Sequence, residues 1–87
     1  MIVVWKFEFP LANEFVLQMP IGARPVTAVF QNGRPCMWAI VNPDESTEDR
    51  FFAIRGTGKG LSGKSSYLTT FLDGSFVWHL FEVRSTE

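Results

Sequence analysis

The sequence predicts an all-β fold, a small antiparallel sandwich or barrel of about seven strands. Apolar residues alternate with polar ones at a period of two over several short segments, which is typical of strands with one buried face. Asn-Gly and Asp-Gly dipeptides each separate two such segments, and these dipeptides favour tight hairpin turns. No segment sustains the i, i+3, i+4 spacing of apolar residues that an amphipathic helix shows.

The first half of the chain contains four predicted strands, over residues 2–9, 14–19, 26–31 and 36–42. Alternation puts the apolar side chains of the first strand on one face, namely Val3, Trp5, Phe7 and Phe9. Asn32-Gly33 joins the third strand to the fourth as a hairpin, because both residue types tolerate positive φ. The fourth strand is apolar on both faces, which predicts a central position in the sheet.

The second half contains three more predicted strands, over residues 50–55, 67–72 and 75–83. An acidic segment, residues 43–49, precedes them and is expected to be a solvated loop, since its spacing matches no calcium-binding loop. Asp73-Gly74 predicts a second hairpin.

Composition limits the chain to one small domain, residues 1–87, without a large catalytic architecture. Eight basic and nine acidic residues give a formal net charge of −1, which argues against binding to a nucleic acid polymer. Cys36 is the only cysteine, so it cannot form an internal disulfide and is expected to be buried. No apolar run is long enough to span a membrane, and no signal peptide is evident, so we expect a cytoplasmic protein.

Several predicted strands carry large apolar side chains on both faces, which is more than a small isolated sheet requires. In the last strand Phe76, Trp78 and Leu80 oppose Val77 and Phe81. Two apolar faces indicate a closed sandwich or a buried subunit interface, and we therefore expect a homo-oligomer.

Residues 58–65, Gly-Lys-Gly-Leu-Ser-Gly-Lys-Ser, match the phosphate-loop pattern G-x-x-x-x-G-K-[ST]. In nucleotide hydrolases a helix follows this loop and its N-terminus surrounds the phosphates. Here residues 66–71 are β-branched and aromatic and predict a strand, so a hydrolase of that class is excluded. Two interpretations stay open: a flexible hairpin connection, or a glycine-rich loop that binds an anion through its N–H groups and lysines.

The second interpretation gives a set of candidate binding residues. The expected phosphate-binding residues are Arg55, Thr57, Lys59, Lys64 and Ser65. Trp38 and Tyr67 are the aromatic residues most expected to stack on a base, with Trp5, Trp78 and Phe52 as alternatives. Such a contact is worth about 1–3 kcal/mol.

The sequence offers little for catalysis. His79 is the only histidine and has no Ser or Asp partner at a readable spacing, so a packed or interfacial histidine is expected. No spacing of His, Cys, Asp or Glu predicts a metal site, and no cofactor motif is present. We therefore expect a protein that is not an enzyme, with a small hydrolase using Asp44, Glu48 and His79 as the open alternative.

Three groups of residues resemble a family of small phage and prophage proteins that is described only as a domain of unknown function. They are Trp5-Lys6-Phe7 with Pro10, Gln31-Asn32-Gly33 with Pro35-Cys36 and Trp38-Ala39, and Phe52 with Ile54 and Gly56-Thr57-Gly58. The resemblance covers about residues 4–82. It implies a phage origin and the host-cell cytoplasm as the setting, but no activity.

Two functions follow as expectations. The first is a non-catalytic phage protein that sequesters a nucleotide immune signal, such as an ADP-ribose derivative or a cyclic dinucleotide; it rests on analogy in size and oligomeric character. The alternative is a protein–protein interaction module that inhibits a host protein or serves in the virion.

Overall fold

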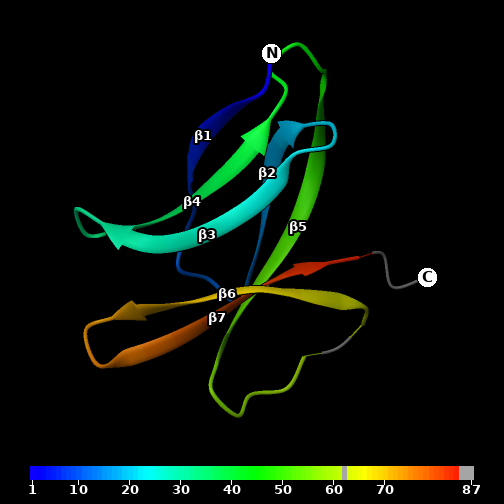
Figure 1. Ribbon diagram of the computed structural model, residues 1–87. Helices are drawn as coiled ribbons and strands as arrows, with labels where there is room; N and C mark the ends of the chain where they lie inside the picture. Colours follow the sequence, from blue (N-terminus) through cyan, green and yellow to red (C-terminus); the bar gives the residue numbers. More distant parts are fainter. Residues whose placement is uncertain (62, 85–87) are drawn as a thin grey trace.

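The computed structural model describes residues 1–61 and 63–84, and all its regular elements are strands (Figure 1). In chain order these are β1 (Val3–Glu8), β2 (Glu14–Pro20), β3 (Arg24–Gln31), β4 (Arg34–Val41), β5 (Thr47–Gly56), β6 (Ser65–Asp73) and β7 (Phe76–Val83). The prediction of an all-β fold with seven strands is confirmed. The described residues contain no helix of the length and hydrophobicity that a membrane span requires.

The strands form two antiparallel sheets that do not close into a barrel. The first sheet has the order β1-β4-β3, and the second has the order β2-β5-β7-β6. Strands β3 and β6 lie against each other where the sheets approach on one side. The arrangement is consistent with a sandwich, one of the two architectures predicted from the sequence.

Both predicted hairpins are present. Asn32 and Gly33 have φ values of 54° and 80° and join β3 to β4, as a turn with two left-handed residues requires. Gly74, with a φ of 60°, lies in the turn between β6 and β7.

The acidic segment differs in extent from the expectation. Residues 47–49 belong to β5, because Thr47, Glu48 and Asp49 continue the backbone pairing with β2. The loop between β4 and β5 is therefore shorter than the seven-residue segment inferred from charge alone.

The core lies between the sheets and is built from the alternate residues of each strand. Phe52, Met19 and Met37 are its largest fully buried side chains, each 1% exposed or less. Aromatic rings extend this core, with Phe15 stacked on Phe52 at a centroid distance of 5.4 Å and on Phe9 at 4.8 Å. Such ring pairs add to the burial of apolar area that stabilises a small fold.

Strand β4 is buried on its core face and only partly buried on its outer face, where Trp38 and Ile40 keep some exposed surface, so the prediction of apolar cover on both faces is confirmed only in part. Met37 and Ala39 face the core with no exposed surface, and Cys36 on the opposite face is 1% exposed. Cys36 is a free thiol, in agreement with the expected buried cysteine. β4 is the central strand of its sheet, between β1 and β3, as its sequence predicted.

An ion pair joins β5 and β7 at the end of the four-stranded sheet where β7 finishes. The Arg50 guanidinium donates two hydrogen bonds to the Glu82 carboxylate, one of them from Nη2 to Oε1 at 3.0 Å. This contact raises the pKa of Arg50 above its ordinary value, although burial acts in the opposite direction. A raised arginine pKa leaves the cation fully charged throughout the neutral range, so this pair does not make stability depend on pH there.

Candidate functional site

A groove lies at the opposite end of the four-stranded sheet, beside the end of β5. It has a volume of about 460 Å³ and is lined by Asn13, Ile54, Arg55, Gly56, Lys59, Gly60 and Trp78. We call it the Trp78 groove. A smaller hollow of about 70 Å³ adjoins it and shares Asn13, Ile54 and Trp78. Both hollows are open to solvent on one side.

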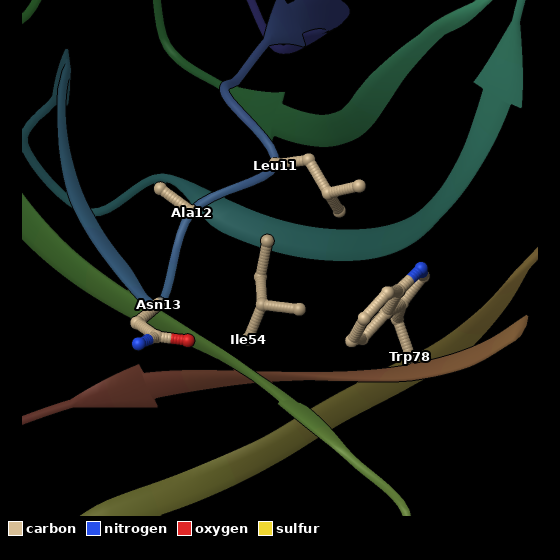
Figure 2. Close-up of a pocket in the computed structure, with 5 residues that line it drawn as sticks. All are labelled: Leu11, Ala12, Asn13, Ile54 and Trp78. Atoms are coloured by element: carbon tan, nitrogen blue, oxygen red, sulfur yellow. The ribbon is translucent and has the colours of Figure 1, made fainter.

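Three segments distant in sequence form this groove. Figure 2 shows Leu11, Ala12 and Asn13 on the linker between β1 and β2, opposite the side chains of Ile54 and Trp78. Ile54 comes from the last part of β5 and Trp78 from the first part of β7. The pairing of Gly56 with Trp78 brings the start of the β5–β6 connection to the same place.

Lys59 and Trp78 meet at Gly56. A methyl group added at Gly56 would lie 3.7 Å from Cζ3 of Trp78 and 3.8 Å from Cγ of Lys59. The backbone N–H of Lys59 donates to the carbonyl oxygen of Gly56 at 3.1 Å, which closes the turn and keeps the lysine backbone beside this glycine. Lys59 has no acidic partner within residues 1–61 and 63–84. The groove therefore combines a flat ring with an uncompensated positive charge.

Arg55 holds two walls of the groove together. Its Nη1 donates to the carbonyl of Asn13 at 2.8 Å, and its Nε donates to the carbonyl of Gly60 at 2.9 Å. Its Nη2 also pairs with the Glu14 carboxylate at 3.4 Å. Because these acceptors take most of its donors and Glu14 offsets its charge, Arg55 shapes the groove more than it offers charge to a ligand.

Two other predicted phosphate-binding residues, Lys64 and Ser65, are not gathered with Lys59, whereas Thr57 lies in the same turn. Strands β5 and β6 both run antiparallel to β7, which lies between them. The connection between β5 and β6 is therefore a crossover and not the hairpin considered from the sequence. Ser65 pairs with Val83, whereas Gly56 pairs with Trp78, a separation along β7 of about 16 Å. Lys64 and Ser65 thus lie at the far end of the sheet, and Ser62 of the same pattern lies outside the described residues.

Trp38 and Tyr67 also lie outside the groove. Trp38 alternates with the core residues Met37 and Ala39 and so occupies the outer face of the three-stranded sheet. Tyr67 packs edge-on against Phe81, with ring centroids 5.8 Å apart, on the outer face of the four-stranded sheet. The aromatic residue that the structure places beside Lys59 is instead Trp78.

A chain of hydrogen bonds runs across that outer face. His79 lies between two threonine hydroxyls, with Nε2 2.8 Å from Oγ1 of Thr57 and Nδ1 2.9 Å from Oγ1 of Thr70. The Thr70 hydroxyl is also 2.6 Å from the Tyr67 hydroxyl. A neutral histidine satisfies both contacts as one donor and one acceptor. The chain anchors Thr57, and hence the start of the crossover, to the sheet.

The residues considered for a hydrolase are far apart. Glu48 pairs with Met19 near the start of β5, whereas Arg55, the partner of His79, is seven positions further along the strand. That separation is about 23 Å. Among the described residues, no three His, Cys, Asp or Glu side chains group to hold a metal ion.

Sequence reasoning missed Leu11, Asn13 and Ile54 as lining residues and gave Trp78 only as one of several alternative stacking residues. Each belongs to an apolar or turn segment with an ordinary structural role, and only the strand order brings them together. The sequence contains one indication of Trp78: residues 76–83 are apolar on both faces of the predicted strand, and alternation puts Trp78 on the face opposite Val77 and Phe81.

Comparison with known proteins gives a family but no activity. Searches of curated proteins and of solved structures gave no match. The profile of a family described as a domain of unknown function, DUF7352, matches residues 1–87. The match confirms the prediction of a family without an assigned function, and the chain therefore belongs to the DUF7352 family.

Proposed function

We propose that this protein binds a phosphate-bearing nucleotide in the Trp78 groove without converting it chemically. The observation that supports the proposal is the meeting of Lys59 and the Trp78 ring at Gly56. A lysine ammonium attracts a phosphate as a point charge, and an indole ring offers a face on which a base can stack. Ile54 and Leu11 extend the apolar wall for the remainder of the ligand.

Binding alone needs no acid–base pair. The groove offers the Lys59 cation, the Arg55 cation whose charge Glu14 offsets, one large ring and backbone groups of a glycine-containing turn. Gly58, with a φ of 86°, follows Thr57 in that turn, and consecutive backbone N–H groups in such turns favour anions. These features suit retention of a ligand, and they are the basis for proposing a protein that is not an enzyme.

The biological setting is also a proposal. On the family resemblance drawn from the sequence motifs, we propose a phage protein acting in the host-cell cytoplasm. Its ligand would then be a nucleotide immune signal, such as an ADP-ribose derivative or a cyclic dinucleotide, which the protein sequesters against host defence. We also propose that the protein is a homo-oligomer.

The two lysines of the phosphate-loop pattern give a matched pair of variants. We expect Lys59→Ala to weaken nucleotide binding about tenfold or more, because it removes the lining cation that has no acidic partner among the described residues. Lys64→Ala should bind as the unmodified protein does, since Lys64 lies at the far end of the sheet. The measurement is calorimetric titration with ADP-ribose, a cyclic dinucleotide, ATP and inorganic phosphate, after a thermal-shift screen of the same panel.

Saturation at 100 times the dissociation constant stabilises a protein by about 2.7 kcal/mol. For a domain of this size the midpoint should then rise by roughly 10 °C or more. Equal losses in the two lysine variants would contradict the assignment of the groove. A panel with no ligand binding below about 100 µM, equivalent to about 5.5 kcal/mol, would contradict nucleotide binding itself.

A second candidate is a protein–protein interaction module, favoured by the apolar side chains on the outer face of the four-stranded sheet. Val16, Phe51, Tyr67 and Leu72 are each at least 50% exposed there. Exposed apolar patches on small proteins often mark interfaces. This candidate predicts that Phe51→Ser abolishes inhibition of a host protein or virion assembly, whereas Lys59→Ala leaves it intact.

A further inference from the structure

The free edge of β1 is the least protected strand edge in the described part of the chain. β1 pairs only with β4, and Figure 1 shows it at the margin of the three-stranded sheet. An edge strand presents unpaired N–H and C=O groups that another strand can satisfy. Soluble proteins usually block such edges with bulges, prolines, charges or a covering segment.

The other edge strands carry such features. The pairing of β3 is interrupted between Pro25 and Thr27, and that of β6 between Tyr67 and Thr69. These two edges also lie against each other. Strand β2 has a regular register, and only its last residue, Pro20, lacks a backbone donor.

Strand β1 has none of these features. Its register with β4 is regular from Val3 to Glu8, and no proline interrupts it. Val4 is 59% exposed and Trp5 41% exposed, so apolar surface lies next to the free backbone groups.

The charges of β1 point away from its free edge. Nζ of Lys6 donates to Oε1 of Gln31 at 2.9 Å, and Gln31 belongs to β3, on the far side of β4. Glu8 pairs with Arg34 of β4 at 3.4 Å. A lysine on an edge strand normally opposes the approach of another strand, but here its charge is directed inward across the sheet.

We propose that β1 pairs with β1 of a second copy of this chain, antiparallel and around a two-fold axis at Trp5. Directly opposed residues of an antiparallel pair lie on the same face. A two-fold axis at Trp5 meets this condition, with Val3 opposite Phe7 and Val4 opposite Lys6. The two three-stranded sheets then join into one continuous sheet, and the Trp5 rings form a cross-strand aromatic pair.

Alternative registers of the same pair are less favourable. An axis at Lys6 opposes two lysines, and like charges directly opposite each other are destabilising. An axis at Phe7 opposes Val4 to Pro10, which lies beyond the strand and cannot donate a hydrogen bond. The register at Trp5 pairs residues 3–7 of both copies without opposing like charges, so the edge is complementary to itself. This self-complementarity identifies the occupant as a second copy.

Disulfide cross-linking at the axis tests the proposal. Opposed residues of an antiparallel pair have Cα atoms about 4.5–5.5 Å apart, which suits a disulfide. With Cys36→Ala removing the native thiol, Trp5→Cys should form a covalent dimer on mild oxidation at micromolar concentration. The matched control is Val16→Cys on β2, an edge residue that is 50% exposed and should remain monomeric on the non-reducing gel.

Light scattering provides a second readout that needs no oxidation. The unmodified protein should have twice the mass of one chain, and Trp5→Lys should reduce it to one chain by opposing two charges at the axis. Val16→Lys should keep the doubled mass. A monomeric unmodified protein, or Trp5→Cys that cross-links no faster than Val16→Cys, would overturn the proposal. Neither result depends on whether a nucleotide binds.

Discussion

Phe52→Ala is expected to lower the free energy of unfolding by about 3–5 kcal/mol. Phe52 is 1% exposed and stacks on Phe15 between the sheets, so its removal leaves a cavity that the surrounding strands cannot fill. The thermal midpoint should fall by roughly 20 °C or more. Urea and thermal unfolding, followed by tryptophan fluorescence, measure the change.

The neighbouring residue supplies the control. Phe51 has the same side chain and the same strand, but alternation places it on the outer face, where it is 51% exposed. Phe51→Ala should therefore change stability by about 0.5 kcal/mol or less. Similar losses in the two variants would contradict the assignment of the core to the space between the sheets.

Trp78→Leu is expected to weaken nucleotide binding by about 5- to 150-fold, which corresponds to the 1–3 kcal/mol of a base–aromatic contact. The ring is the largest side chain of the groove and the only aromatic one among its lining residues. Leucine keeps an apolar side chain at this position, where Trp78 packs against the core. Affinity is measured by calorimetry well below the unfolding midpoint of each variant.

Trp38→Leu is the matched control for this effect. It removes the same ring from a partly buried position on the other sheet, so we expect it to lower the free energy of unfolding as Trp78→Leu does. The groove is unchanged, because Trp38 does not line it. Binding by Trp38→Leu should equal that of the unmodified protein. A loss of nucleotide affinity in Trp38→Leu and not in Trp78→Leu would indicate that Trp38 stacks on the base, as first expected from the sequence.

The strands were predictable because their signals are local. Alternation places Val3 and Phe7 on one face of the first strand, where both pack against the core. Asn32-Gly33 needs only its own backbone preferences to form a turn. Phe51 and Phe52 differ in burial for the same reason, since successive side chains of a strand point to opposite faces. Such features depend on a few neighbouring residues and are independent of the order of the strands in the sheets.

The site was not predictable because it depends on strand order. The sequence treats Lys59 and Lys64 as members of one loop, but the placement of β7 between β5 and β6 carries them to opposite ends of a sheet. From the sequence alone, Arg55 is expected to be a free cation. In the structure it donates hydrogen bonds to the carbonyl groups of Asn13 and Gly60. The residues around Trp78 in the sequence are those expected around an ordinary core residue. The groove exists because the linker between β1 and β2 forms a wall opposite Trp78.

The indole N–H resonances of the three tryptophans test the central claim most directly. Trp5, Trp38 and Trp78 lie at the edge of one sheet, on the outer face of that sheet and in the groove, respectively. The Nε1 atom of Trp78 is buried and has no hydrogen-bond partner among the described residues, so its resonance should respond to any ligand that enters. Titration of the ¹⁵N-labelled protein with ADP-ribose or a cyclic dinucleotide should shift the Trp78 signal and leave that of Trp38 unchanged. Saturable shifts at Trp38 with Trp78 unaffected would place binding elsewhere and contradict the assignment of the groove.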